Sequence, residues 1–332
     1  MSAPAMAHGW LQNTWHNLFG ANAASRHSHH GTHHVQHHKP KTPAPPPPVF
    51  VVPTGTIAAN ALSMPDQPFA LHEWDGSLIT LREHALGAPT NWVAVLMDNT
   101  SLHFACRDGL VQMLPTIGDN TSLPAGTSPC GLPGGQSSLV LAWDRSRVGD
   151  PAPDWSDFWD VARHPGKRSL RLDPRSTLEI ALLADGVAPA DVYSVLSTEA
   201  GVDRAFRKLD QLRPYIVWWR TPEDATRIMS SGAALMIGTP IDELAALPKP
   251  VNFAVQWRQS LRQNLSWAIP HNVPNPSAEH VAIVLRDQAP RHEDTQDGPL
   301  PDGSILTIND NFWATHLESL QKRFQDWFSP PP

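Results

Sequence analysis

Short apolar runs alternate with amphipathic segments along the chain from residue 49 onward. The apolar runs predict strands, because a few consecutive apolar residues between turn signals suit a strand buried in a sheet. They lie at 49–52, 69–74, 92–97, 138–144, 215–219, 233–239 and 264–270. Segments with helical spacing lie at 77–86, 176–185, 201–212, 221–232 and from about 309 onward. This alternation of strands and helices predicts an α/β protein.

Two of the predicted helices carry recognisable start and stop signals. Ser176 and Glu179 have the S-x-x-E spacing of a capping box, and Gly186 follows as a stop signal. Thr221 and Pro222 have the residue types favoured at the cap and the first helical position of the other helix. These signals predict where the chain enters each helix.

The first 48 residues differ from the rest in composition. They hold no acidic residue, nine of the 17 histidines and a proline run, so we expect a disordered arm that is dispensable for folding. Neutral imidazoles in closely spaced doublets can bind zinc, nickel or copper. The alternative is a solvated tail that binds such metals only adventitiously. The candidate metal ligands are His29, His30, His33, His34, His37 and His38.

Charge and hydropathy limit the partners of the remaining chain. Beyond the arm, 22 basic side chains face 32 acidic ones, a balance that argues against nucleic acid as a partner. No run of 18 apolar residues exists, so no segment is expected to span a membrane. The first 30 residues also lack a basic segment followed by an apolar core, which disfavours a secretion signal.

Catalytic signatures are scarce in this sequence. It contains no G-x-S-x-G, P-loop, G-x-G-x-x-G or H-E-x-x-H motif, and His103, His164 and His271 are far apart. We therefore expect neither an enzyme nor a cofactor. Cys106 and Cys130 could form one disulfide or remain two buried thiols, and composition leaves both alternatives open.

The stretch WSDFWDVARHPGKRSLR, residues 155–171, carries a family resemblance. Together with GAALMIGT, SWAIPHNVPNPSAEHVAIVLRD and LTINDNFWATHLESLQKRFQDWF, it resembles the spermidine/putrescine-type substrate-binding proteins of bacterial ABC importers. The resemblance implies a two-lobe type II periplasmic-binding-protein fold with hinge strands at 139–144 and 262–268. It also implies that the aromatic residues of this stretch pack into the core of the second lobe.

The resemblance further implies a domain organisation and a location. Residues 1–48 form the arm, 49–143 with 264–305 the first lobe, and 144–263 with 306–332 the second lobe and C-terminal helix. Both cysteines fall in the first lobe, where an exported chain would pair them. The implied location is periplasmic, with a membrane permease as partner; the missing secretion signal leaves a cytoplasmic location as the alternative.

The resemblance also places a ligand site between the lobes, with departures from the family pattern. Asp173 falls on a ligand carboxylate, whereas Ser176 and Leu265 replace two others, and the loop at 238–240 lacks the usual aromatic residue. The alternative for the segment around Asp173 is a plain helix cap with Arg175 solvated. The candidate ligand residues are Asp98, Asn99, Thr100, Asp173, Arg175, Ser176, Thr239 and Asn264.

These residues favour an amine-containing ligand. Carboxylates pair with ammonium groups, whereas a helix start beside Arg175 suits a carboxylate or phosphate. The expected function is therefore capture of a polyamine-like or zwitterionic molecule for an ABC transporter. The alternative is a binding-protein fold that has lost transport and acts in interaction, sensing or metal handling.

Overall fold

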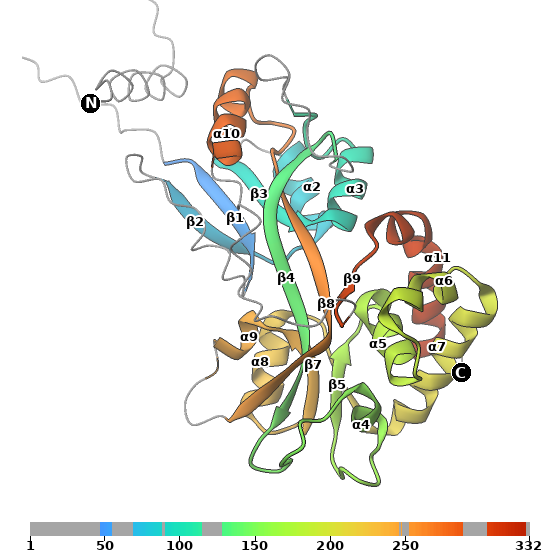
Figure 1. Ribbon diagram of the computed structural model, residues 1–332. Coiled ribbons are helices and arrows are strands. Elements are labelled where there is room, and N and C mark those ends of the chain that lie inside the picture. The colour runs from blue at the N-terminus through green and yellow to red at the C-terminus, as the bar shows by residue number, and fades with distance from the viewer. Residues whose placement is uncertain are drawn as a thin grey trace, which may run out of the picture.

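Two α/β lobes are joined by two long strands in the computed structural model (Figure 1). The structure describes residues 47–54, 69–87, 90–114, 128–245, 247, 252–287 and 304–329. The predicted arm and its six candidate metal ligands lie outside these residues. Within the described ranges, no cluster of three or more His, Cys, Asp or Glu side chains could hold a metal ion.

The described residues of the first lobe form three strands and three helices. They are β1 (Val49–Pro53), β2 (Ala70–Trp74), α2 (Leu78–Leu86), β3 (Trp92–Asp98), α3 (Asn99–Arg107) and α10 (Asn275–Asp287). The connecting strands are β4 (Gly131–Asp144) and β8 (Phe253–Ala268), and the short β9 (Leu306–Thr307) pairs with β8.

The second lobe contains three strands and most of the helices. They are α4 (Trp155–Trp159), β5 (Arg168–Arg171), α5 (Pro174–Ala184), α6 (Val192–Leu196), α7 (Glu199–Leu212), β6 (Ile216–Trp219), α8 (Pro222–Ser230), β7 (Met236–Pro240), α9 (Asp242–Ala245) and α11 (Asp310–Phe328). Single turns of 3₁₀ helix lie at 189–191 and 213–215. No helix among the described residues is long and apolar enough to cross a membrane.

One mixed sheet runs through both lobes in the order β2-β1-β3-β8-β4-β7-β5-β6. Neighbouring strands are parallel within each lobe, whereas β3–β8, β8–β4 and β4–β7 are antiparallel. Strands β4 and β8 pair from Gly131–Ala268 to Asp144–Phe253. Both connecting strands are therefore much longer than the predicted hinge segments at 139–144 and 262–268.

Each lobe has its own apolar core. The buried clusters of the first lobe use residues from 49–111, 130–132 and 265–285, and those of the second lobe use residues from 141–261 and 306–324. Because β4 and β8 serve both lobes, the domain boundaries along them remain a prediction.

The aromatic residues of α4 are core residues, as predicted. Trp155, Phe158 and Trp159 are all buried, and they pack against one another with ring centroids less than 6 Å apart. The Trp155 indole Nε1 also donates a hydrogen bond of 2.9 Å to the carbonyl oxygen of Gln259 in β8. Helix α4 therefore fixes the second lobe to a connecting strand.

Two local predictions are wrong. Ser176 does not cap a helix through a box with Glu179: α5 starts earlier, and Asp173 is its N-cap. The segment at 215–219 is not a fully buried strand, because β6 is the last strand of the sheet order and only its Trp219 is fully buried. An edge strand has a neighbouring strand on only one side and is therefore less buried. An apolar run alone does not distinguish it from a central strand.

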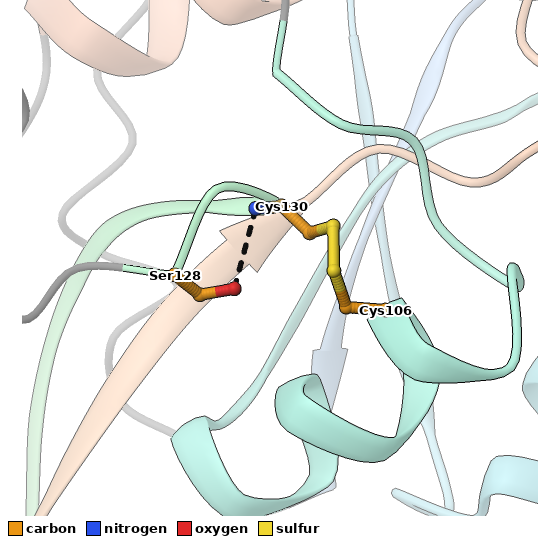
Figure 2. The surroundings of a disulfide bond; sticks show 3 residues. All are labelled: Cys106, Ser128 and Cys130. Carbon is orange, nitrogen blue, oxygen red and sulfur yellow. Dashed lines mark hydrogen bonds between the residues drawn. A yellow bond between two sulfur atoms is a disulfide. The ribbon is translucent and has the colours of Figure 1, made fainter.

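Cys106 and Cys130 form a disulfide, with Cα atoms 5.9 Å apart. Figure 2 shows that this bond joins the end of α3 to the chain just before β4, where the Cys130 amide donates to Ser128 Oγ. The disulfide confirms the prediction for an exported chain, and the alternative of two buried thiols is wrong. It also attaches α3 to the start of a connecting strand.

Candidate functional site

Three helices start close together where the two lobes meet. Asp98 caps α3 and accepts hydrogen bonds from the amide and the hydroxyl of Ser101, at 2.8 and 2.7 Å. Asp173 caps α5, and Asp310 is the first residue of α11. Each helix start therefore brings an aspartate together with the positive end of a helix dipole, which suits ligands of mixed charge.

Arg175 forms a two-pronged ion pair with Asp173. Its Nε donates to Oδ1 at 3.0 Å and its Nη2 donates to Oδ2 at 2.8 Å. Burial alone would raise the pKa of the Asp173 carboxyl, but the guanidinium groups of Arg175 and Arg171 outweigh burial and lower it. Asp173 is therefore ionised, and it fixes the orientation of the Arg175 fork.

The same guanidinium reaches the other lobe. Arg175 Nη1 lies 3.8 Å from Asp98 Oδ1, so the side chain links the end of β3 to the start of α5. The Arg175 side chain is only 17% exposed. The alternative in which Arg175 is solvated is therefore wrong.

Ser176 has an unusual backbone conformation for a residue other than glycine. Its φ of +68° lies in the left-handed region, and Arg175 before it is extended, with ψ of 137°. Such a conformation costs about 1–3 kcal/mol and is found mostly at ligand sites and switch regions. The break turns the chain between Asp173 and the regular part of α5, and so aims Arg175 toward Asp98.

Asn99 and Thr100 complete the first-lobe side of this group. The hydroxyl of Ser266 in β8 donates to Asn99 Oδ1 at 2.7 Å. Thr100 Oγ1 donates across the lobe junction to Asp310 Oδ1 at 3.0 Å. Burial and the nearby negative charge of Asp98 raise the pKa of Asp310 to about 6.

The last two candidate residues, Thr239 and Asn264, have other surroundings. Thr239 is fully buried in β7, and its Oγ1 has no hydrogen-bond partner among the described residues. Asn264 Oδ1 accepts a hydrogen bond of 2.9 Å from Gln136 Nε2 on the paired strand. Neither hydrogen-bonds to the group around Arg175 in the described part of the chain.

Sequence reasoning missed Arg171, Glu179 and Asp310 as members of this group. Arg171 ends β5, and its Nη2 lies 4.0 Å from Asp173 Oδ2. In the sequence, Asp310 looks like one of the acidic residues that are common in the first turn of a helix. Only the return of the chain to the lobe junction through β9 brings it to Thr100.

Glu179 is a fully buried carboxyl beside this group. Its Oε1 accepts hydrogen bonds from Trp313 Nε1 at 2.7 Å and from the Tyr193 hydroxyl at 2.9 Å. Its Oε2 has no hydrogen-bond partner within the part of the chain that the structure describes. Burial raises the pKa of Glu179 to about 7, because an ionised carboxylate is poorly stabilised there.

We expect Glu179→Gln to change how stability depends on pH. In the wild type the folded state retains a proton that the unfolded state loses near its ordinary pKa, so stability falls as the pH rises through 7. Glutamine keeps an acceptor for Trp313 and Tyr193 but has no charge. Relative to wild type, the variant should gain about 2 kcal/mol between pH 5 and pH 8.

Urea unfolding at several pH values between 5 and 8 measures this difference. If the difference in free energy of unfolding between variant and wild type does not change with pH, Glu179 does not titrate in this range. Glu318→Gln, on an exposed part of α11, is the matched control and should show no such trend.

Comparison with known proteins identifies relatives over most of the chain. The model of a family described as bacterial extracellular solute-binding protein matches residues 80–302. The gamma-aminobutyric acid-binding protein of Pseudomonas aeruginosa is 31% identical over 284 residues, which cover 77% of this chain and 81% of that protein.

Solved structures share the fold at lower sequence identity. The PBP MotA from A. tumefaciens B6 in complex with glucopine has a TM-score of 0.70 at 20% identity, covering 85% of this chain and 100% of that chain. A spermidine/putrescine ABC transporter substrate-binding protein from Streptococcus pneumoniae has a TM-score of 0.59 at 15% identity, covering 85% and 99%. The predicted two-lobe binding-protein fold is confirmed.

Proposed function

Because the chain belongs to the bacterial extracellular solute-binding proteins, we propose that it captures a small zwitterion for the permease of an ABC importer. The family consists of binding proteins, as expected for a chain without a catalytic motif. The proposed ligand carries an ammonium group and a carboxylate, and the proposed location is periplasmic. The P. aeruginosa relative is named for a molecule of this kind.

The position of Arg175 carries the proposal. The guanidinium lies between the carboxylates of Asp173 and Asp98, and only Asp173 holds it with two short hydrogen bonds. A ligand carboxylate can replace the weak 3.8 Å contact to Asp98 and bind the free side of the fork. The Asp98 carboxylate is then available for the ligand ammonium.

The same arrangement argues against a polyamine. A polyamine carries only positive charge, and a buried guanidinium in the site would repel it. Leu265 is buried where the resemblance implies a hinge carboxylate, and Gly238 has no aromatic side chain to cover a methylene chain. We therefore favour the zwitterionic alternative among the predicted ligands.

Calorimetry with 4-aminobutyrate, butyrate and putrescine tests this function. The zwitterion should bind, and the two molecules that lack one of its charges should bind at least tenfold more weakly. Preferred binding of putrescine would overturn the zwitterion proposal. Absence of binding by all three would favour the alternative in which the fold has lost transport.

Asp173→Asn should lower the affinity for 4-aminobutyrate about tenfold, or 1.4 kcal/mol. The amide keeps the shape but no longer holds Arg175 through a charged pair. Stability should fall as well, because Arg175 and Arg171 lose their buried anionic partner even though asparagine can still cap α5. Asp185→Asn, a carboxylate that pairs with Arg204 away from the site, is the control. Equal affinities of Asp173→Asn and wild type would refute a role for Asp173.

A further inference from the structure

Asp310 is an acidic residue of the second lobe that contacts the first lobe. Helix α11 packs in the second lobe through buried Trp313 and Phe324, which fixes where Asp310 lies. The carboxylate nevertheless accepts its hydrogen bond from Thr100 of the first lobe, at 3.0 Å. Thr100 is fully buried, so this contact lies inside the lobe junction.

No positive side chain among the described residues pairs with Asp310. Arg175 pairs with Asp173 and lies close to Asp98. Arg107 pairs with Glu318, two turns further along α11 than Asp310, at 3.2 Å. Asp98, at the start of the helix that carries Thr100, adds a second negative charge close to Asp310. Thr100, which contacts Asp310, lies two residues after Asp98, so one carboxylate from each lobe lies near the junction, and like charges there repel.

We propose that Asp98 and Asp310, one from each lobe, together receive the ammonium group of the ligand. This inference rests on the proposed function and assigns the ammonium end of the same site. With a cation between them, the two carboxylates attract it instead of repelling each other, so binding favours lobe closure. Without the cation, their repulsion opposes closure.

The raised pKa of Asp310 agrees with this arrangement. Burial and Asp98 both disfavour the ionised form when no cation is present. A bound ammonium would favour the ionised form again. The Asp310 carboxylate therefore contributes to selection of the ligand, in addition to its contact with Thr100.

Asp310→Asn tests the assignment. The amide keeps the size and can accept from Thr100, but it has no charge for the ammonium. We expect the affinity for 4-aminobutyrate to fall at least tenfold in calorimetry at pH 8. The melting temperature should not fall, because the variant removes a half-buried charge that pairs with no cationic side chain among the described residues.

Glu318→Gln is the matched control, because Glu318 also crosses the lobe junction from α11 but its side chain is 77% exposed. Its affinity should stay within about twofold of wild type. Unchanged affinity of Asp310→Asn, or a loss accompanied by a lower melting temperature, would overturn the inference. Failure of the wild type to bind 4-aminobutyrate would instead overturn the proposed function on which the inference rests.

Discussion

Arg175→Gln should lower the affinity for 4-aminobutyrate by about 100-fold or more. The substitution removes the guanidinium that we propose pairs with the ligand carboxylate. It also leaves Asp173 buried with Arg171 as its remaining cation, at 4.0 Å. Removal of one partner of a buried charged pair costs about 2–5 kcal/mol, which corresponds to a factor of roughly 30 to several thousand.

Calorimetry of the variant should be accompanied by urea unfolding, because the unpaired Asp173 also reduces stability. Arg175→Lys separates the two effects: it keeps a charge for Asp173 but loses the planar fork. We expect it to fold and to bind about tenfold more weakly than wild type. Arg227→Gln, which affects only an exposed pair with Asp224, is the control. Wild-type affinity of both Arg175 variants would disprove the role of the guanidinium.

The double substitution Cys106→Ala with Cys130→Ala should lower the free energy of unfolding by about 3 kcal/mol. The disulfide joins residues separated by 24 positions and so restricts the unfolded chain. It also ties the end of α3 to the start of β4. Alanine suits the buried position of Cys130 better than serine, because it adds no buried hydroxyl.

Reductant provides the test of this value. Urea unfolding of wild type with reductant should match the variant, and the variant itself should not respond to reductant. Because α3 carries Asp98 and Thr100 at its other end, ligand affinity should also fall when the bond is absent. A wild type whose unfolding midpoint does not respond to reductant would contradict a stabilising disulfide.

Most elements were predictable from local patterns. Helix α11 and the helix at 199–212 have apolar residues on one face, and the structure buries these faces. The full length of β8 was not predictable, because residues 253–259 are only half-buried and mix polar with apolar side chains. Their pairing with β4 holds them in the sheet regardless of composition.

The site was predictable only in part. The resemblance predicted Asp173 and its neighbours as candidates, but S-x-x-E was misread because Trp313 and Tyr193, from other helices, bind Glu179. The left-handed conformation of Ser176 is equally invisible in the sequence, since serine rarely adopts it. Asp310 meets Thr100 through long-range contacts that no local pattern contains.

The order of strands in the sheet also has a consequence for how the chain folds. Strand β3 pairs on one side with β1, which lies shortly before it in the sequence. On its other side it pairs with the distant strand β8, for example through Val95 and Ala268. During synthesis the second lobe therefore emerges before the first lobe can be completed. Until then the free edge of β3 exposes unpaired amides and carbonyls, which promotes aggregation. Such distant pairing slows folding and prolongs the time during which the unfinished chain can aggregate.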